Sequence, residues 1–402
     1  MLFIKIIKYF YVSLTLLALF SPTYFSIYDF LPGLIIMWIF FYIFYFSFRK
    51  SQYNFSLIHS DIDKKYFIGL TLLFFGFYPL YIEYYTGTSM ISSLLSIGSG
   101  VSNYYNYQNN FLEKGLGGFS LNKLPYILGH GILKFSFLYL FFSYFLFQKN
   151  RPFLTLICII LMFFVFFLVG LSRGTSFEIF EIFNFILFAF VISKMQKNKR
   201  LIFNVKSFLL FNFLVVISVI FFMNHIIERY GGNLDFTSLA NYNQNSLISS
   251  ISPFFSILLF SLYGYFSFGL HFTSTIFYNL WSDSIDGFFS IFFKDGIQLF
   301  GISVSYREYA NNFIDVGAQW TPDIVSLFQN IGLLGGILFI FFLGLISRFL
   351  IKKINYSVTS VILLFYSYFY MISLPIGNFV SVSSSNQICI FLGFIFLVLN
   401  RK

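Results

Sequence analysis

Apolar runs of about 20 residues recur along almost the whole chain and are separated by short polar connectors. A run of this length, wound as an α-helix, crosses the hydrocarbon core of a bilayer. The helix satisfies its own backbone polar groups, which find no water in that core. The chain is 58% hydrophobic and only 10% charged, whereas a soluble domain carries about 25% charged residues. The sequence therefore predicts an all-α polytopic membrane protein.

The runs predict a single integral membrane domain over residues 1–402, with about ten transmembrane helices. The predicted spans are residues 6–25, 30–48, 66–85, 125–147, 153–171, a sixth that ends at 191, 207–223, 324–346, a ninth that ends at 374, and 387–399. Gly332 and Gly336 form a pair of small residues one helical turn apart, which predicts close helix packing in the eighth span.

Basic residues set the predicted orientation. The net charge of +10 would suggest nucleic acid in a soluble protein, but here the Lys and Arg residues lie in short gaps between apolar runs, most densely over 194–206. Such connectors are enriched on the cytoplasmic side. With both termini in the cytoplasm, most of the 25 Lys and Arg residues fall on that side. No nucleic-acid partner is expected.

This orientation places two polar segments outside, residues 86–124 and the large late loop 224–323. Within the second, residues 252–268 are apolar but are interrupted by Pro253 and Gly264, with Gly269 directly after. A re-entrant or interfacial helix pair is the preferred interpretation, because one extra span would reverse every later charge assignment.

Neither a disulfide nor a metal site is expected. Cys158 and Cys389 both lie inside apolar runs. Asp61 and Asp63 have the spacing of carboxylates that hold a metal-bound sugar nucleotide, but their connector has no room for a nucleotide-binding domain, so a solvated charge cluster is favoured. Asp29, a single carboxylate in the first outer loop, is likewise only weak evidence for an acidic pair at an active site.

Arg173 is the most informative charged residue, because it lies between two strongly apolar helices. An unpaired arginine there costs several kcal/mol, so it needs a partner or an anionic ligand. Ser172 is expected to cap the next helix, whose first N–H groups also attract anions. The alternative is an internal ion pair with Glu178 or Glu181.

Two further arginines, Arg229 and Arg307, lie near the ends of the late loop, each beside a glutamate and tyrosines. A guanidinium binds phosphate through two parallel N–H bonds, so Arg173, Arg229 and Arg307 together form a candidate diphosphate clamp. Surface ion pairs are the alternative for the two loop arginines. The candidate general bases are four residues of the late loop: His225, Glu228, His271 and Asp323.

Residues 321–332 read TPDIVSLFQNIG and lead into a Gly-rich apolar helix. This segment resembles the late loop-to-helix segment of Wzy-type O-antigen and capsule polymerases, and the Ser172-Arg173-Gly174 turn resembles another recurrent element of that family. Arg173, Thr321, Pro322 and Gly332 carry the match. The expected topology agrees over nearly the whole chain, whereas Arg229 and Arg307 are assigned by position alone.

The resemblance implies a GT-C-like fold, similar to O-antigen ligase, in the bacterial inner membrane. It implies a metal-independent glycosyltransferase without cofactors that joins undecaprenyl-diphosphate-linked oligosaccharide repeat units at the outer face. Membrane lipid is the other expected partner, and dependence on a chain-length regulator stays open.

A lipid-linked oligosaccharide flippase and an O-antigen ligase are the alternative functions. A transporter is expected to show internal repeats and polar residues deep in several helices. The sequence has no such repeat, and Lys134 is the only basic residue well inside a predicted span. A structural scaffold would leave the outward arginines unexplained.

Overall fold

The computed structural model describes residues 2–49, 62–95, 100–114, 121–175, 177–196, 241–283, 322–381 and 383–399. Within these ranges the chain is helical, and no strand is formed. The helices of the first half are α1 (Leu2–Phe20), α2 (Ile27–Phe48), α3 (Lys64–Thr86), α4 (Met90–Leu95), α5 (Gly100–Glu113), η1 (Leu121–Lys123), α6 (Leu124–Phe142), η2 (Ser143–Phe147), α7 (Phe153–Arg173) and α8 (Phe177–Gln196). Those of the second half are α10 (Leu247–Ile251), α11 (Pro253–Phe266), α12 (Phe268–Asp283), α15 (Asp323–Lys353), α16 (Val358–Ser373) and α17 (Ser384–Leu399).

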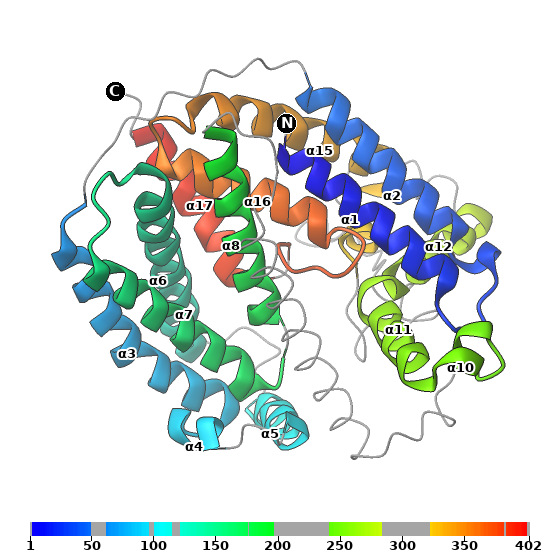
Figure 1. Ribbon diagram of the computed structural model, residues 1–402, viewed down its shortest axis with the longest axis horizontal. Helices are drawn as coiled ribbons and strands as arrows, with labels where there is room; N and C mark the ends of the chain where they lie inside the picture. The colour runs from blue at the N-terminus through cyan, green and yellow to red at the C-terminus, as the bar shows by residue number, and fades with distance from the viewer. Residues whose placement is uncertain are drawn as a thin grey trace.

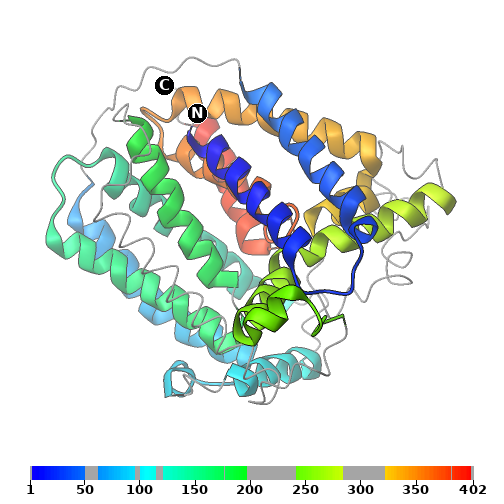
Figure 2. The ribbon, with the colours of Figure 1, turned by 45° about the vertical axis from the view of Figure 1, so that its right-hand side comes forward.

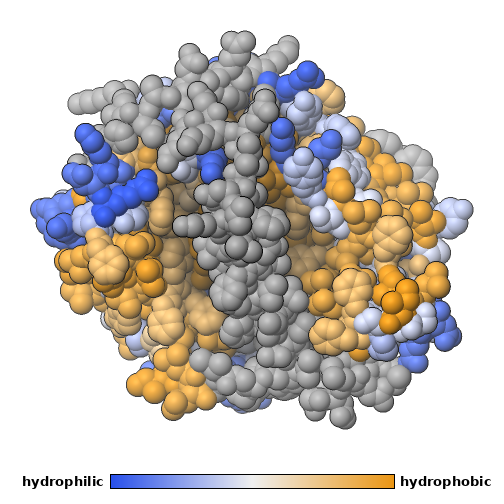
Figure 3. Space-filling view, in the orientation of Figure 1, coloured by the Kyte–Doolittle hydropathy of each residue, from blue (hydrophilic) through white to orange (hydrophobic). Residues whose placement is uncertain are grey.

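The described helices confirm an all-α, membrane-embedded protein. Six of them are long and apolar enough to cross a bilayer, or up to seven if a bent pair counts as one span. Every predicted span within the described residues coincides with a helix. The predicted span 207–223 lies outside them, so the number of ten stays a prediction. Figure 3 shows apolar residues over most of the described part of one face, with hydrophilic residues gathered toward its margins.

The helices form two groups around a central one. Figures 1 and 2 show α3, α6 and α7 together on one side of the molecule and α1, α2, α12 and α15 on the other. The closest packing within these groups is of α3 on α7 and of α2 on α12 and α15. The short helices α4 and α5 pack against α7 and lie at one end of the first group. They occupy most of the described part of the predicted loop 86–124.

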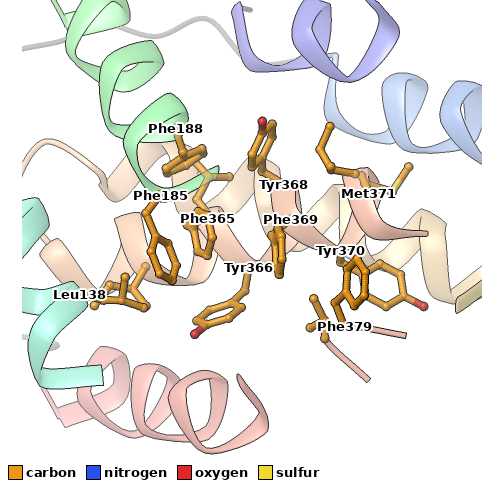
Figure 4. Packing of buried hydrophobic residues seen from close by; sticks show 14 of the residues in the cluster. Leu138, Phe185, Phe188, Phe365, Tyr366, Tyr368, Phe369, Tyr370, Met371 and Phe379 are labelled. Carbon is orange, nitrogen blue, oxygen red and sulfur yellow. The ribbon is translucent and has the colours of Figure 1, made fainter. Parts of the chain in front are cut away.

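Helix α16 is the centre of the bundle. All of its residues are buried, and it packs against α1, α6, α8, α15 and α17. A helix that is apolar on every side is stable only when it is surrounded by other helices or lipid. Figure 4 shows its aromatic side chains projecting to several sides, with Phe365 toward Phe185 and Phe188 of α8 and Tyr366 toward α17.

Glycines allow α2 to approach its two neighbours closely. A Cβ atom at Gly33 would overlap the backbone carbonyl of Leu270 in α12, and one at Gly344 of α15 would overlap Ser47. Gly336 also faces α2, since a Cβ atom there would lie 3.1 Å from the ring of Phe40. Close packing by small residues, expected for Gly336, is therefore present on this face of α15.

Gly332 has a different role from the packing role expected of it. It interrupts α15 with φ 64° and ψ −178°, a backbone conformation that is essentially restricted to glycine. The helix therefore consists of a short segment that begins at Asp323 and a long segment, Ile331–Lys353, that is apolar enough to span the membrane. The short segment places Asp323 inside the protein.

The helix pair expected within residues 252–268 is present with different bounds, because α11 alone fills that interval and its partner α12 follows it. The two helices are bent by 50° relative to each other, which fits a broken span or a re-entrant loop. Pro253 occupies the first position of α11, where its missing N–H costs nothing. The break falls at Ser267, whose N–H still bonds to the carbonyl of Tyr263, and not at Gly264 or Gly269.

Candidate functional site

Arg173 is the last residue of α7 and is followed by a tight turn. Gly174 ends the helix in the left-handed conformation with φ 60°, as glycine commonly does at this position. The backbone of Tyr104 in α5 lies so close that a Cβ at Gly174 would be 2.8 Å from its nitrogen. The expectation that Ser172 caps the next helix is wrong, because its hydroxyl donates to the carbonyl of Val169 within α7.

The guanidinium of Arg173 has two partners and spare capacity. Nη1 lies 2.7 Å from Glu178 Oε1, and Nη2 donates to the hydroxyl of Tyr107 at 3.1 Å. The group also lies over the Tyr107 ring, 4.9 Å from its centroid, a favourable position for a cation. Nε has no hydrogen-bond partner among the described residues and is itself buried, whereas the side chain as a whole is 26% exposed. Nη1 and Nη2 each carry a second N–H beyond the bonds to Glu178 and Tyr107.

Glu178 is fixed for this pairing by the start of α8. Its second carboxylate oxygen accepts a bond from the Thr175 hydroxyl at 2.9 Å, and the side chain is only 4% exposed. A carboxylate in the first turn of a helix is also favoured by the helix dipole. The internal ion pair that the sequence allowed for Arg173 is therefore present, and Glu178 rather than Glu181 makes it.

Glu181 instead pairs with Lys134 in the interior of the bundle. Lys134 Nζ lies 2.7 and 2.6 Å from the two carboxylate oxygens of Glu181 and 2.6 Å from Asn386 Oδ1. A weaker contact reaches Ser385 Oγ at 3.5 Å. Both charged side chains are 1% exposed. A lone charge at this depth would cost several kcal/mol, so the pair keeps both groups stable inside the protein.

His130 lies one turn before Lys134 on α6 and was not among the residues predicted from the sequence. Its Nδ1 is 3.0 Å from the Tyr78 hydroxyl, and its ring stacks on Tyr81 with centroids 4.8 Å apart. The i, i+4 spacing of His130 and Lys134 within one apolar run was a signal that both lie on one face of the helix.

Asp323 is completely buried at the first turn of α15. Its carboxylate accepts a short hydrogen bond from Ser381 Oγ, and Ser373 Oγ lies 3.5 Å away. The N–H of Ile324 bonds to the carbonyl of Leu374, which fixes the helix start against the end of α16. No described Lys or Arg forms an ion pair with Asp323.

This environment favours the protonated carboxyl. Asp323 precedes the spanning segment Ile331–Lys353, and burial raises its pKa to about 7, although the bonds from Ser381 and Ser373 act to lower it. A carboxyl that titrates near neutral pH exchanges protons readily under physiological conditions, which is what a general base requires.

His271, a second base candidate, is half-buried on α12. Its Nδ1 lies 3.2 Å from the backbone carbonyl of Asp29, and its ring lies against Phe25 with centroids 4.3 Å apart. Asp29 itself accepts bonds from the N–H and hydroxyl of Ser26 at the start of α2. Within the described residues no hydrogen bond connects His271 to Arg173 or Asp323.

Four candidate residues lie outside the described ranges, so their place relative to Arg173 stays a prediction: His225, Glu228, Arg229 and Arg307. Asp61 also lies outside them. Asp63 caps α3 by accepting from the Lys65 N–H, and it pairs with the Lys65 ammonium at 3.3 Å. This agrees with a solvated charge cluster.

The polar groups best suited to chemistry are the partly exposed Arg173 and the buried Asp323. In the described part of the chain, no three His, Cys, Asp or Glu side chains are grouped closely enough to hold one metal ion. Comparison with protein-family models, with curated proteins and with solved structures finds no match.

Proposed function

We propose that this protein is a polymerase of undecaprenyl-diphosphate-linked oligosaccharide repeat units, acting at the outer face of the bacterial inner membrane. The proposal combines the polytopic helical architecture with the family resemblance of the Ser172-Arg173-Gly174 turn and of residues 321–332. The product is an O-antigen, capsule or exopolysaccharide chain.

The observation that carries the proposal is the state of Arg173. It is held in place by Glu178 and Tyr107, yet its side chain is 26% exposed and each Nη carries a second N–H beyond those two bonds. A guanidinium so oriented is ready to accept an anionic ligand at little cost in side-chain entropy. A lipid diphosphate supplies pairs of phosphate oxygens that a guanidinium fork can bind through two parallel N–H bonds.

In the proposed reaction, a sugar hydroxyl of one lipid-linked repeat unit attacks the anomeric carbon of the growing glycan. The bond from that carbon to the lipid diphosphate breaks, and a new glycosidic bond forms. Negative charge gathers on the departing diphosphate, where Arg173 stabilises it with Arg229 and Arg307 as candidate companions. Asp323 is the described carboxylate best suited to take the hydroxyl proton, because its pKa lies near 7. His225, Glu228 and His271 remain candidates for the same step.

The decisive experiment is gel analysis of surface glycan from a deletion strain. Loss of a polymerase leaves lipid core capped by a single repeat unit. Loss of a flippase or a ligase leaves no repeat unit attached. A bare core would therefore overturn the proposal in favour of one of these alternatives.

A lipid-linked oligosaccharide transporter is the second candidate function. Two observations favour it: the buried pair of Lys134 and Glu181, and the interruption of α15 at Gly332. Buried charges and broken helices are common where transporters bind their substrates. The same gel distinguishes it, since a transporter supplies the repeat units and its loss removes all of them from the surface.

Metal independence provides a separate test. If arginines alone neutralise the diphosphate, polymerisation by the purified protein should continue in excess EDTA. Complete loss of activity that magnesium restores would instead implicate acidic residues as metal ligands.

A further inference from the structure

The buried pair of Lys134 and Glu181 is part of a larger polar hub. Asn386 of α17 accepts from Lys134 and also from the Tyr366 hydroxyl of α16, at 3.1 Å. We use the name polar hub for Lys134, Glu181, Tyr366 and Asn386. These four side chains come from α6, α8, α16 and α17, so one set of hydrogen bonds joins four helices.

Asn386 also links the polar hub to the connection between α16 and α17, because its amide nitrogen bonds there while its oxygen bonds within the hub. Its Nδ2 donates to the backbone carbonyl of Phe379 at 2.8 Å. The next residue of α17, Gln387, donates to the carbonyl of Ser381. Two neighbouring side chains of α17 thus hold two backbone carbonyls of the connection between α16 and α17.

Ser381 is the residue of this connection that bonds to Asp323. It lies two positions after Phe379, so the Asn386 bond fixes the backbone from which the Ser381 hydroxyl projects. A hydroxyl bonded to a carboxylate favours the charged form and sets the direction of the remaining lone pairs. The position of Ser381 therefore affects both the protonation and the orientation of Asp323.

We propose that the polar hub is a positioning device for Asp323: Lys134 and Asn386 hold the connection between α16 and α17 so that Ser381 stays bonded to the carboxylate. The inference rests on the proposed function only in treating Asp323 as a general base. Asn386 and Lys134 are positioning residues in this account, since neither contacts the carboxylate.

The test measures Asp323 directly and does not require the glycan reaction. A hydrophobic carbodiimide modifies protonated, buried carboxyls, and mass spectrometry of the purified full-length protein gives the rate at each site. At alkaline pH, Asn386→Leu should raise the labelling rate of Asp323 roughly tenfold, because about one unit of pKa separates a bonded from an unbonded carboxylate. Ser381→Ala should give a similar increase by removing the bond itself.

Two controls separate positioning from general loosening. Tyr368→Phe removes another buried tyrosine bond of α16, that to Asn184 Oδ1, which does not reach the connection, and should leave Asp323 labelling unchanged. Labelling of Glu178, a buried carboxylate on α8, should also stay constant in Asn386→Leu. An equal rise at Glu178 and Asp323 would overturn the proposal.

A second variant covers the case in which Asn386→Leu does not fold. Lys134→Met combined with Glu181→Leu removes both buried charges and leaves neither alone, while Asn386 loses its bond to the ammonium. Asp323 labelling should again rise severalfold. The double change Asn386→Leu with Ser381→Ala should label no faster than either single change, because both act on one bond.

Wild-type labelling of Asp323 in Asn386→Leu, or in the charge-free pair variant if only that one folds, would overturn the proposal. Additive effects of Asn386→Leu and Ser381→Ala would do the same. Labelling does not require the substrate, so these outcomes do not test the polymerase proposal, which the surface-glycan gel tests separately. A gel result against the polymerase would likewise not contradict the positioning of Asp323.

Discussion

Two carboxylates of α8, one helical turn apart, form ion pairs that differ in how far their cations are exposed. Glu181 of α8 pairs with Lys134 in a site where both side chains are 1% exposed. Glu178 pairs with Arg173, whose side chain is 26% exposed and whose Nε lacks a described partner. The first cation uses its donors on Glu181, Asn386 and Ser385. The second uses one N–H of Nη1 on Glu178 and one of Nη2 on Tyr107, and each nitrogen carries another.

The two cations differ in exposure because they lie at different positions along their helices. Lys134 lies within α6, so its ammonium has only protein groups to solvate it. Arg173 ends α7 beside a turn, so water or an anion can reach it. A buried pair mainly avoids the cost of a lone charge, whereas a partly exposed guanidinium can exchange partners. The comparison predicts that loss of Lys134 destabilises the protein strongly, whereas changes at Arg173 affect activity with little effect on stability.

The largest expected effect is on stability, at Lys134. Lys134→Met leaves the Glu181 carboxylate buried without a cation and should cost about 3–5 kcal/mol. Combining it with Glu181→Leu should recover most of this loss, because neither charge then remains. Thermal unfolding of the purified protein in detergent, together with its abundance in membranes, measures both. A single variant as stable as the wild type would show that the pair contributes little.

Arg173 should show the opposite pattern. Arg173→Lys keeps the charge, so folding and abundance should change little, but lysine cannot form two parallel N–H bonds to a diphosphate. Losing roughly 3 kcal/mol of transition-state stabilisation slows the reaction about a hundredfold. The measurement is glycan ladder length at wild-type abundance, with Arg229→Lys and Arg307→Lys beside it. A normal ladder would remove Arg173 from the site.

The two ion pairs also show what the sequence alone could and could not predict. Apolar runs predicted the long helices, and Gly174 predicted the turn after Arg173, whereas the helices α4 and α5 and the position of the bend between α11 and α12 were not predicted. Glu178 and Glu181 are three residues apart and share one face of α8, so spacing alone left either able to pair with Arg173. Only the packing of α6 against α17 and α8 decides that Glu181 belongs to Lys134.

The burial of Asp323 and the conformation of Gly332 were missed for a related reason. The sequence placed Asp323 in a loop before a helix, where a carboxylate is usually solvated. Its burial depends on Ser373 and Ser381, which lie about 50 residues or more away in the chain. The role of Gly332 depends on its φ angle, and a glycine inside an apolar run reads equally well as a packing residue.

Asp323 differs from both glutamates because it is buried without an ion-pair partner among the described residues. A base acts only when deprotonated, and burial raises the pKa of Asp323 to about 7, so the rate should fall about tenfold for each pH unit below that value. Ser381→Ala removes a bond that favours the charged form and should move the profile to higher pH. The pH dependence of the initial rate measures both. A flat profile between about pH 5 and 8 would remove Asp323 from the proton transfer.

The smallest expected effect is on stability, at Glu178, and it tests whether the two pairs really differ. Glu178→Gln keeps one acceptor oxygen for Arg173, while its NH2 can donate to the Thr175 hydroxyl, and the guanidinium is exposed enough to be partly hydrated. The loss of stability should therefore be about 1 kcal/mol, well below that of Lys134→Met. Removing the nearby negative charge should also leave the KM for the lipid-linked substrate unchanged or lower it, since the carboxylate competes with a diphosphate for the same donors. Thermal unfolding and initial rates against substrate concentration give the two values. If Glu178→Gln destabilises the protein as strongly as Lys134→Met does, Arg173 is a second buried structural cation, and the residues of the late loop must carry the anion binding without it.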